Sequence, residues 1–109
     1  ISKTAPGEAS ASIRERVITA RARQTERFKQ HKHIHCNAQM TERMIHQYAE
    51  PDEAGISMLR MAMERLSLSA RAYNRILKVA RTIADLAGAP HTQMAHVAEA
   101  MQYRRTLAK

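Results

Sequence analysis

Apolar residues recur at helical spacing through most of this 109-residue chain, most regularly over residues 69–88. There they fall at i, i+3, i+4 and i+7, which is typical of a helix with one buried face. The face comprises Ala72, Tyr73, Ile76, Leu77, Ala80, Ile83, Ala84 and Ala87. Ser69 can cap the first turn, Gly88 can form the left-handed turn that ends a helix, and Pro90 prevents continuation. The pattern predicts a long central helix.

A second periodic segment precedes it near the start of the chain. The first helix is predicted to begin near Ser10 or Ser12 and to run to about Lys29. One side of it is apolar or uncharged and is expected to pack inward: Ile13, Val17, Ala20, Gln24 and Phe28. Residues 30–40 break the periodicity and are predicted to form a loop.

Three shorter segments complete the pattern. One helix is predicted from Thr41, which can cap it, to about Tyr48, and the next is predicted to open at Pro51 and Asp52 and to run to about residue 66. After Gly88, a last helix is predicted with Thr92 as its cap. Its apolar side carries Met94, Val97, Ala98 and Met101.

These elements predict an all-α fold, a compact bundle of about five helices. The short connections indicate that neighbouring helices pack roughly antiparallel. The composition agrees, because alanine is frequent, methionine occurs 7 times, and there are only 3 glycines and 3 prolines. Residues 1–9 are expected to be a disordered linker, residues 10–105 the helical domain, and residues 106–109 a frayed tail.

The chain has a formal charge of +8, so its surface is expected to be strongly basic. Such a balance favours anionic partners, but a solvated basic surface facing an acidic partner domain explains it equally well. The single cysteine, Cys36, excludes an internal disulfide and fits a reducing compartment. No apolar run reaches membrane-spanning length, so we expect a cytoplasmic protein without a membrane partner.

Metal and catalytic motifs are weak or missing. His31, His33, His35 and Cys36 lie in one loop and are metal-ligand types, but no second Cys/His pair follows at a suitable distance, so we predict no metal site. There is no phosphate-binding glycine loop and no carboxylate pair placed as acid and base. We therefore assign no catalytic residue.

A basic stripe follows the apolar face of the central helix and consists of Arg71, Arg75, Lys78 and Arg81. Arg71 lies in the first turn, where free N–H groups and the helix dipole favour an anion, and its guanidinium suits phosphate oxygens. It is thus a candidate phosphate contact, with an ordinary surface arginine as the alternative. Arg14 and Arg21 of the first helix, together with Arg75 and Lys78, are candidate DNA or inter-domain contacts. For the arginines of the first helix, solvent-facing charges are the alternative.

Three segments resemble a known family: LSLSARAYNRILKVARTIADLAG, HVAEAMQYR and, upstream, ASIRERVITARARQTERF. They are similar to the C-terminal region of the magnesium-chelatase-related AAA+ ATPases, in the ComM/YifB competence branch. The resemblance covers about residues 8–105 and implies a helical lid that follows an ATP-binding core in the same chain. In the family's Ser-Ala-Arg motif the sensor-2 arginine matches Arg71. The histidine-rich loop departs from the family pattern.

The resemblance also implies ATP and Mg in the full-length protein, with none bound by this fragment alone. It further implies a homo-oligomer, a hexamer, that acts on DNA in natural transformation, with Arg75, Lys78 and Arg81 as lid-to-core or solvent contacts. Two alternatives remain open: a nucleic-acid-binding helical module, and an interaction domain within a chelatase-like complex. The residues leave open whether Arg71 acts within its own subunit or on a neighbour.

Overall fold

The computed structural model describes the backbone of residues 10–107 and the side chains of residues 10–103, so the predicted linker, residues 1–9, lies outside the described residues. The elements are α1 (Ser10–Arg27), the 3-10 turn η1 (Asn37–Gln39), α2 (Glu42–Tyr48), α3 (Glu53–Leu66), α4 (Ala70–Leu86) and α5 (Met94–Leu107). Residues 10–107 contain no strand, and the predicted all-α fold is confirmed. None of these helices is long and apolar enough to cross a membrane.

Short polar side chains begin three of the helices. Thr41 accepts a hydrogen bond from the Met44 N–H at 3.3 Å, Asp52 from the Gly55 N–H at 2.8 Å, and Ser69 from the Ala72 N–H at 3.1 Å. Each satisfies a backbone donor that has no partner within its helix. The predicted caps at Thr41 and Ser69 are confirmed.

The start of α5 differs from the prediction. Thr92 is buried, and its hydroxyl finds no hydrogen-bond partner among the described residues. Gln93 immediately precedes the helix instead, and its N–H donates to Nδ1 of His96 at 2.9 Å. A side chain from the first turn therefore reaches back to satisfy the end of the helix, as in a capping box, and Thr92 is not the cap. At its other end α5 continues through Leu107, past position 106, where we predicted the frayed tail to begin.

The core is assembled around α4, which packs against α1, η1, α2 and α5, while α3 packs against α5. Its largest fully buried apolar side chains come from four different helices: Ile45, Leu59, Leu77 and Val97. The predicted face of α4 is buried at its centre, whereas Ala87 at its end is exposed. The prediction that α4 is the central helix is confirmed.

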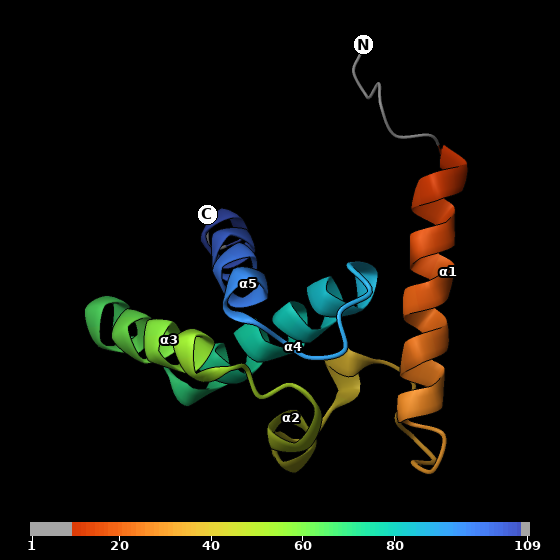
Figure 1. Cartoon of the computed structure of the whole chain (residues 1–109). Helices are drawn as coiled ribbons and strands as arrows, with labels where there is room; N and C mark the ends of the chain where they lie inside the picture. Colours follow the sequence, from red (N-terminus) through yellow and green to blue (C-terminus); the bar gives the residue numbers. More distant parts are fainter. Residues whose placement is uncertain (1–9, 108–109) are drawn as a thin grey trace.

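Helix α1 lies to one side of the bundle and joins it only through its C-terminal half (Figure 1). Ala20, Gln24 and Phe28 are buried, but every residue from 10 to 19 is exposed. Ile13 and Val17, which we expected to pack inward, are 45% and 36% exposed. The expected inward face is therefore covered over only half of its length, because no other helix among residues 10–107 buries the first turns of α1.

Candidate functional site

The N-terminus of α4 is held in place by the residues that precede it. Ser67 takes the left-handed conformation (φ 53°) that ends α3, and the N–H of Leu68 donates to the Met63 carbonyl at 3.1 Å. Leu68 is buried in the core. Ser69 then caps α4, so Arg71 is the second residue of the helix and is exposed. Its guanidinium is thus displayed beside the positive end of the α4 dipole.

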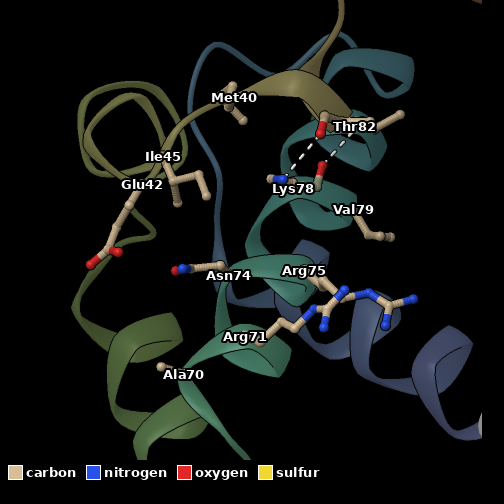
Figure 2. Close-up of a pocket in the computed structure, with 11 residues that line it drawn as sticks. Met40, Glu42, Ile45, Ala70, Arg71, Asn74, Arg75, Lys78, Val79 and Thr82 are labelled. Carbon is tan, nitrogen blue, oxygen red and sulfur yellow. Dashed lines mark hydrogen bonds between the residues drawn. The ribbon is translucent and has the colours of Figure 1, made fainter.

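An open pocket of about 770 Å³ runs along this part of α4. One wall is α4 from Ala70 to Thr82, and the other comprises residues of η1, the following link and α2, including Met40, Glu42 and Ile45 (Figure 2). Its volume falls in the range of about 300–1,000 Å³ that is common for small-molecule sites. The pocket therefore has room for a ligand the size of a nucleotide phosphate chain.

Three cations line this pocket and only one carboxylate does. Arg71, Arg75 and Lys78 are spaced at i, i+4 and i+7, which brings them to one side of α4. The guanidinium groups of Arg71 and Arg75 extend to the same side of the helix (Figure 2). The carboxylate is that of Glu42. An excess of positive charge next to a helix N-terminus favours an anionic ligand.

The far end of the pocket is held together by hydrogen bonds between its two walls. The Lys78 ammonium donates to the Ala38 carbonyl at 3.0 Å. The Asn37 side-chain amide donates to Thr82 Oγ1 at 3.0 Å, and that hydroxyl donates to the Lys78 carbonyl at 3.1 Å. Lys78 therefore links the two walls of the pocket, whereas Arg71 and Arg75 stay exposed.

The last member of the basic stripe, Arg81, does not belong to the pocket. It is 3% exposed and donates to Asp85 Oδ1 at 3.0 Å, to the Ala89 carbonyl at 2.9 Å and to the Pro90 carbonyl at 3.2 Å. Our expectation that Arg81 makes lid-to-core or solvent contacts is wrong. Its side chain turns back over the C-terminal turn of α4 and ties the α4–α5 connection to the helix.

Asp85 is the centre of a buried polar network. Asp85 is 1% exposed. Its carboxylate accepts two hydrogen bonds from Arg27, at 2.9 and 2.7 Å, and one from the Asn37 amide at 2.9 Å, in addition to that from Arg81. Asn37 in turn accepts from Arg27 at 2.9 Å, and its N–H donates to Gln24 Oε1 at 2.9 Å. The network joins α1, η1, α4 and the α4–α5 connection.

Two opposing effects act on the charges in this network. Burial alone would raise the pKa of Asp85, but hydrogen bonds from Arg27 and Asn37 and the charges of Arg27 and Arg81 outweigh it and hold that pKa below its usual value. Burial lowers the pKa of Arg81, although an arginine stays protonated in proteins. The network therefore holds one carboxylate between two guanidinium groups.

The other predicted site residues lie elsewhere. Arg14 and Arg21 are exposed on α1 and are not among the residues that line the pocket. The ring of His31 packs edge-on against Phe28 and Tyr48, with ring centroids 6.3 and 6.5 Å apart, respectively. Across the described part of the chain, no three His, Cys, Asp or Glu side chains are grouped so as to hold a metal ion.

Residues 7–104 match the protein family described as magnesium chelatase, subunit ChlI C-terminal. The chain belongs to this family. Competence protein ComM of Haemophilus influenzae is 41% identical over 98 residues, which cover 90% of this chain and 18% of that protein. The uncharacterized protein YifB of Escherichia coli is 40% identical over 105 residues, covering 95% of this chain and 20% of that protein. The uncharacterized protein Mb2921c of Mycobacterium bovis is 34% identical over 96% of this chain.

This magnesium chelatase C-terminal domain spans about a fifth of the length of the curated relatives that it matches. No solved structure matches it significantly. The matched segment includes both the pocket on α4 and the Asp85 network. The predicted resemblance to the ComM/YifB branch is confirmed.

Sequence reasoning identified the pocket cations but missed the network. Asp85 is the only acidic residue between Glu64 and Glu99, and it lies four residues after Arg81. That i, i+4 spacing permits an ion pair between Arg81 and Asp85 on one face of the helix, and it was the sequence feature that could have indicated the network. Its burial depends on Arg27 and Asn37, which are 58 and 48 residues away along the chain.

Proposed function

We propose that this domain is the helical lid of an AAA+ ATPase and that Arg71 acts as its sensor-2 arginine, which contacts the γ-phosphate of ATP. The observation that carries the proposal is the position of Arg71: exposed, second in α4, directly after the Ser69 cap, and in a cationic pocket. Family membership supports it, because the matched motif Ser69-Ala70-Arg71 is the one in which the resemblance places the sensor arginine.

The pocket fits the phosphates of a nucleotide better than it fits a metal ion. Arg71 offers forked donors that pair with two phosphate oxygens at once, and Arg75 adds positive charge one turn later. Mg²⁺ prefers carboxylate and phosphate oxygens, and Glu42 is the single carboxylate here. We therefore assign phosphate binding to this domain, and Mg²⁺ binding to the ATP-binding core with which it would act.

When bound, ATP supplies the phosphoryl group that the core hydrolyses, and the part of this chain is to sense it. Arg71 would hold the γ-phosphate while the rigid bundle closes over the core, and it would lose that contact after hydrolysis. Closure can move the bundle as one body because the Asp85 network and the apolar core join α1, η1 and α4.

The relatives and the family resemblance support a proposal for the whole protein. One of them is a competence protein, which supports a role for the whole protein in natural transformation. We propose a homo-oligomeric motor, a hexamer, that acts on DNA in the cytoplasm, with this lid joined to the ATPase core of its own chain. ATP and Mg²⁺ are the cofactors of that assembly.

The test is the ATPase activity of the longer protein in which this domain lies. Arg71→Ala is expected to lower kcat by about 100-fold, the cost typical of removing a preorganised charge from a transition state. Arg60→Ala is the matched control, because Arg60 is exposed on α3 and does not line the pocket. Wild-type turnover in the Arg71 variant, with the control unchanged, would contradict the assignment.

A further inference from the structure

The exposed half of α1 carries an organised surface. The side of this helix that faces the bundle carries the buried residues Ala20, Gln24 and Phe28. At the same helical spacing this side continues toward the N-terminus through Val17 and Ile13, which are exposed. We call Ile13 and Val17, with the adjoining edge of Ala20, the α1 stripe. It extends the core side of the helix into the region where α1 stands away from the bundle (Figure 1).

Arginines border the stripe on both sides. Successive residues are displaced by about 100° around a helix. Arg14 and Arg21 each directly follow a residue of the stripe or its continuation, so they lie along one border. Arg16 and Arg23 each precede one, so they lie along the other. Glu15 falls on the opposite side of the helix, away from the stripe.

An exposed helical extension of this kind is costly unless something covers it. Residues 10–19, about 15 Å of helix at 1.5 Å per residue, bury no side chain in the bundle. Helices without tertiary packing are marginal in water, and exposed apolar surface on a soluble protein commonly marks an interaction site. A partner that covers the α1 stripe must therefore complement an apolar centre and a cationic border on each side of it.

We propose that the α1 stripe is a docking surface for an acidic amphipathic protein segment, a helix or groove whose apolar centre is bordered by Asp or Glu on both sides. Ile13 and Val17 would insert into the apolar centre, as in helix-in-groove recognition. Arg14 and Arg21 would pair with carboxylates along one border. Arg23 would pair with carboxylates along the opposite border. Charge pairs on both borders would make binding specific, in addition to the affinity that apolar burial provides.

Other occupants fit the stripe less well. A second copy of this chain brings a formal charge of +8 to a cationic surface and would be repelled. A nucleic acid would pair with the arginines but would lay charged phosphates across Ile13 and Val17. A membrane is disfavoured because the exposed stripe is short and Phe28, the aromatic residue that continues it, is buried in the core.

The test measures binding of this chain to a synthetic helical peptide that has leucines along one face and glutamates on both borders. Fluorescence anisotropy of the labelled peptide is expected to show saturable binding that weakens as salt is added. Two control peptides, one with lysines in place of the glutamates and one with serines in place of the leucines, are expected not to bind.

Variants of α1 then assign the surface. Ile13→Ser combined with Val17→Ser is expected to weaken peptide binding about tenfold or more, through loss of apolar burial. Arg14→Ser combined with Arg21→Ser is expected to weaken it and to reduce its salt dependence. Ile18→Ser is the matched control, because Ile18 is on the same helix and is 58% exposed but lies off the stripe. Far-UV circular dichroism checks that each variant keeps the wild-type fold.

Four results would overturn the proposal. They are no binding of the acidic peptide, equal loss of binding in the Ile18 control, tighter binding of a short DNA duplex or of phosphatidylglycerol vesicles through the same residues, and dimerisation of the chain that the Ile13/Val17 variant abolishes. The last three would reassign the surface to non-specific contact, to nucleic acid or membrane, or to a second copy.

Discussion

The two ends of α4 carry the same kind of side chain and use it in opposite ways. Arg71, in the first turn, is exposed in an open pocket, whereas Arg81, near the last turn, is 3% exposed and encloses a carboxylate. Both belong to one basic stripe at i+3/i+4 spacing. The N-terminal end therefore has a cation available for a ligand, and the C-terminal end has a cation committed to the fold.

The difference arises from what each end meets in space. At the C-terminal end, Arg27 from α1, Asn37 from η1 and the carbonyls of the α4–α5 connection converge on Asp85 and Arg81. At the N-terminal end, Arg71 and Arg75 line an open pocket and remain exposed. A buried charge without a partner strongly destabilises a protein. Arg81 has partners and is buried, whereas Arg71, which belongs to the same basic stripe, stays exposed.

The largest effect is expected from Asp85→Ala, which breaks the buried end. It leaves the guanidinium groups of Arg27 and Arg81 without their shared carboxylate, and removal of one partner of a buried ion pair costs about 3–5 kcal/mol. Urea unfolding followed by circular dichroism measures the free energy. Arg75→Ala, at the exposed end, is the control and is expected to change stability by no more than about 0.5 kcal/mol. Equal effects of the two substitutions would erase the contrast between the ends.

Acid should weaken the buried end selectively. The folded state holds the pKa of Asp85 below its usual value, so the folded protein binds that proton less readily than the unfolded chain does. The stabilisation is therefore fully present above the unfolded pKa of about 3.9 and is lost as pH falls through the folded pKa. Unfolding free energies at pH 6 and pH 3 are expected to differ more in the wild type than in Asp85→Asn. A parallel fall in both proteins would place the acid sensitivity elsewhere.

A smaller effect is expected at the exposed end from Ser69→Ala. The substitution removes the hydroxyl that accepts from the Ala72 N–H, and loss of such a cap costs about 1 kcal/mol. Thermal melting measures it, with Ser57→Ala on α3 as the control, since Ser57 is exposed and does not cap its helix. An unchanged melting temperature would show that the first turn of α4, and with it Arg71, does not depend on the cap.

The sequence predicted most helix positions because those depend on local chemistry. Thr41 and Ser69 each directly precede a segment with apolar residues at helical spacing, and each caps the helix that follows. Leu77 is in the core because it lies on the apolar face of α4. What it could not predict depends on distant neighbours. Arg81 is buried beside Arg27 and Asp85, and His96 rather than Thr92 caps α5. Ile13 stays exposed because no other described helix buries it. The exposed position of Arg71 in the first turn of α4 could be predicted because the helix itself defines it.

Nucleotide-induced stabilisation of the longer protein tests whether Arg71 senses the γ-phosphate. A ligand that binds the folded state raises the melting temperature according to its affinity. The wild type and the Arg60→Ala control are expected to gain more from a non-hydrolysable ATP analogue than from ADP. In Arg71→Ala that difference is expected to disappear while stabilisation by ADP persists. A full difference between the two nucleotides in Arg71→Ala would show that Arg71 does not sense the γ-phosphate.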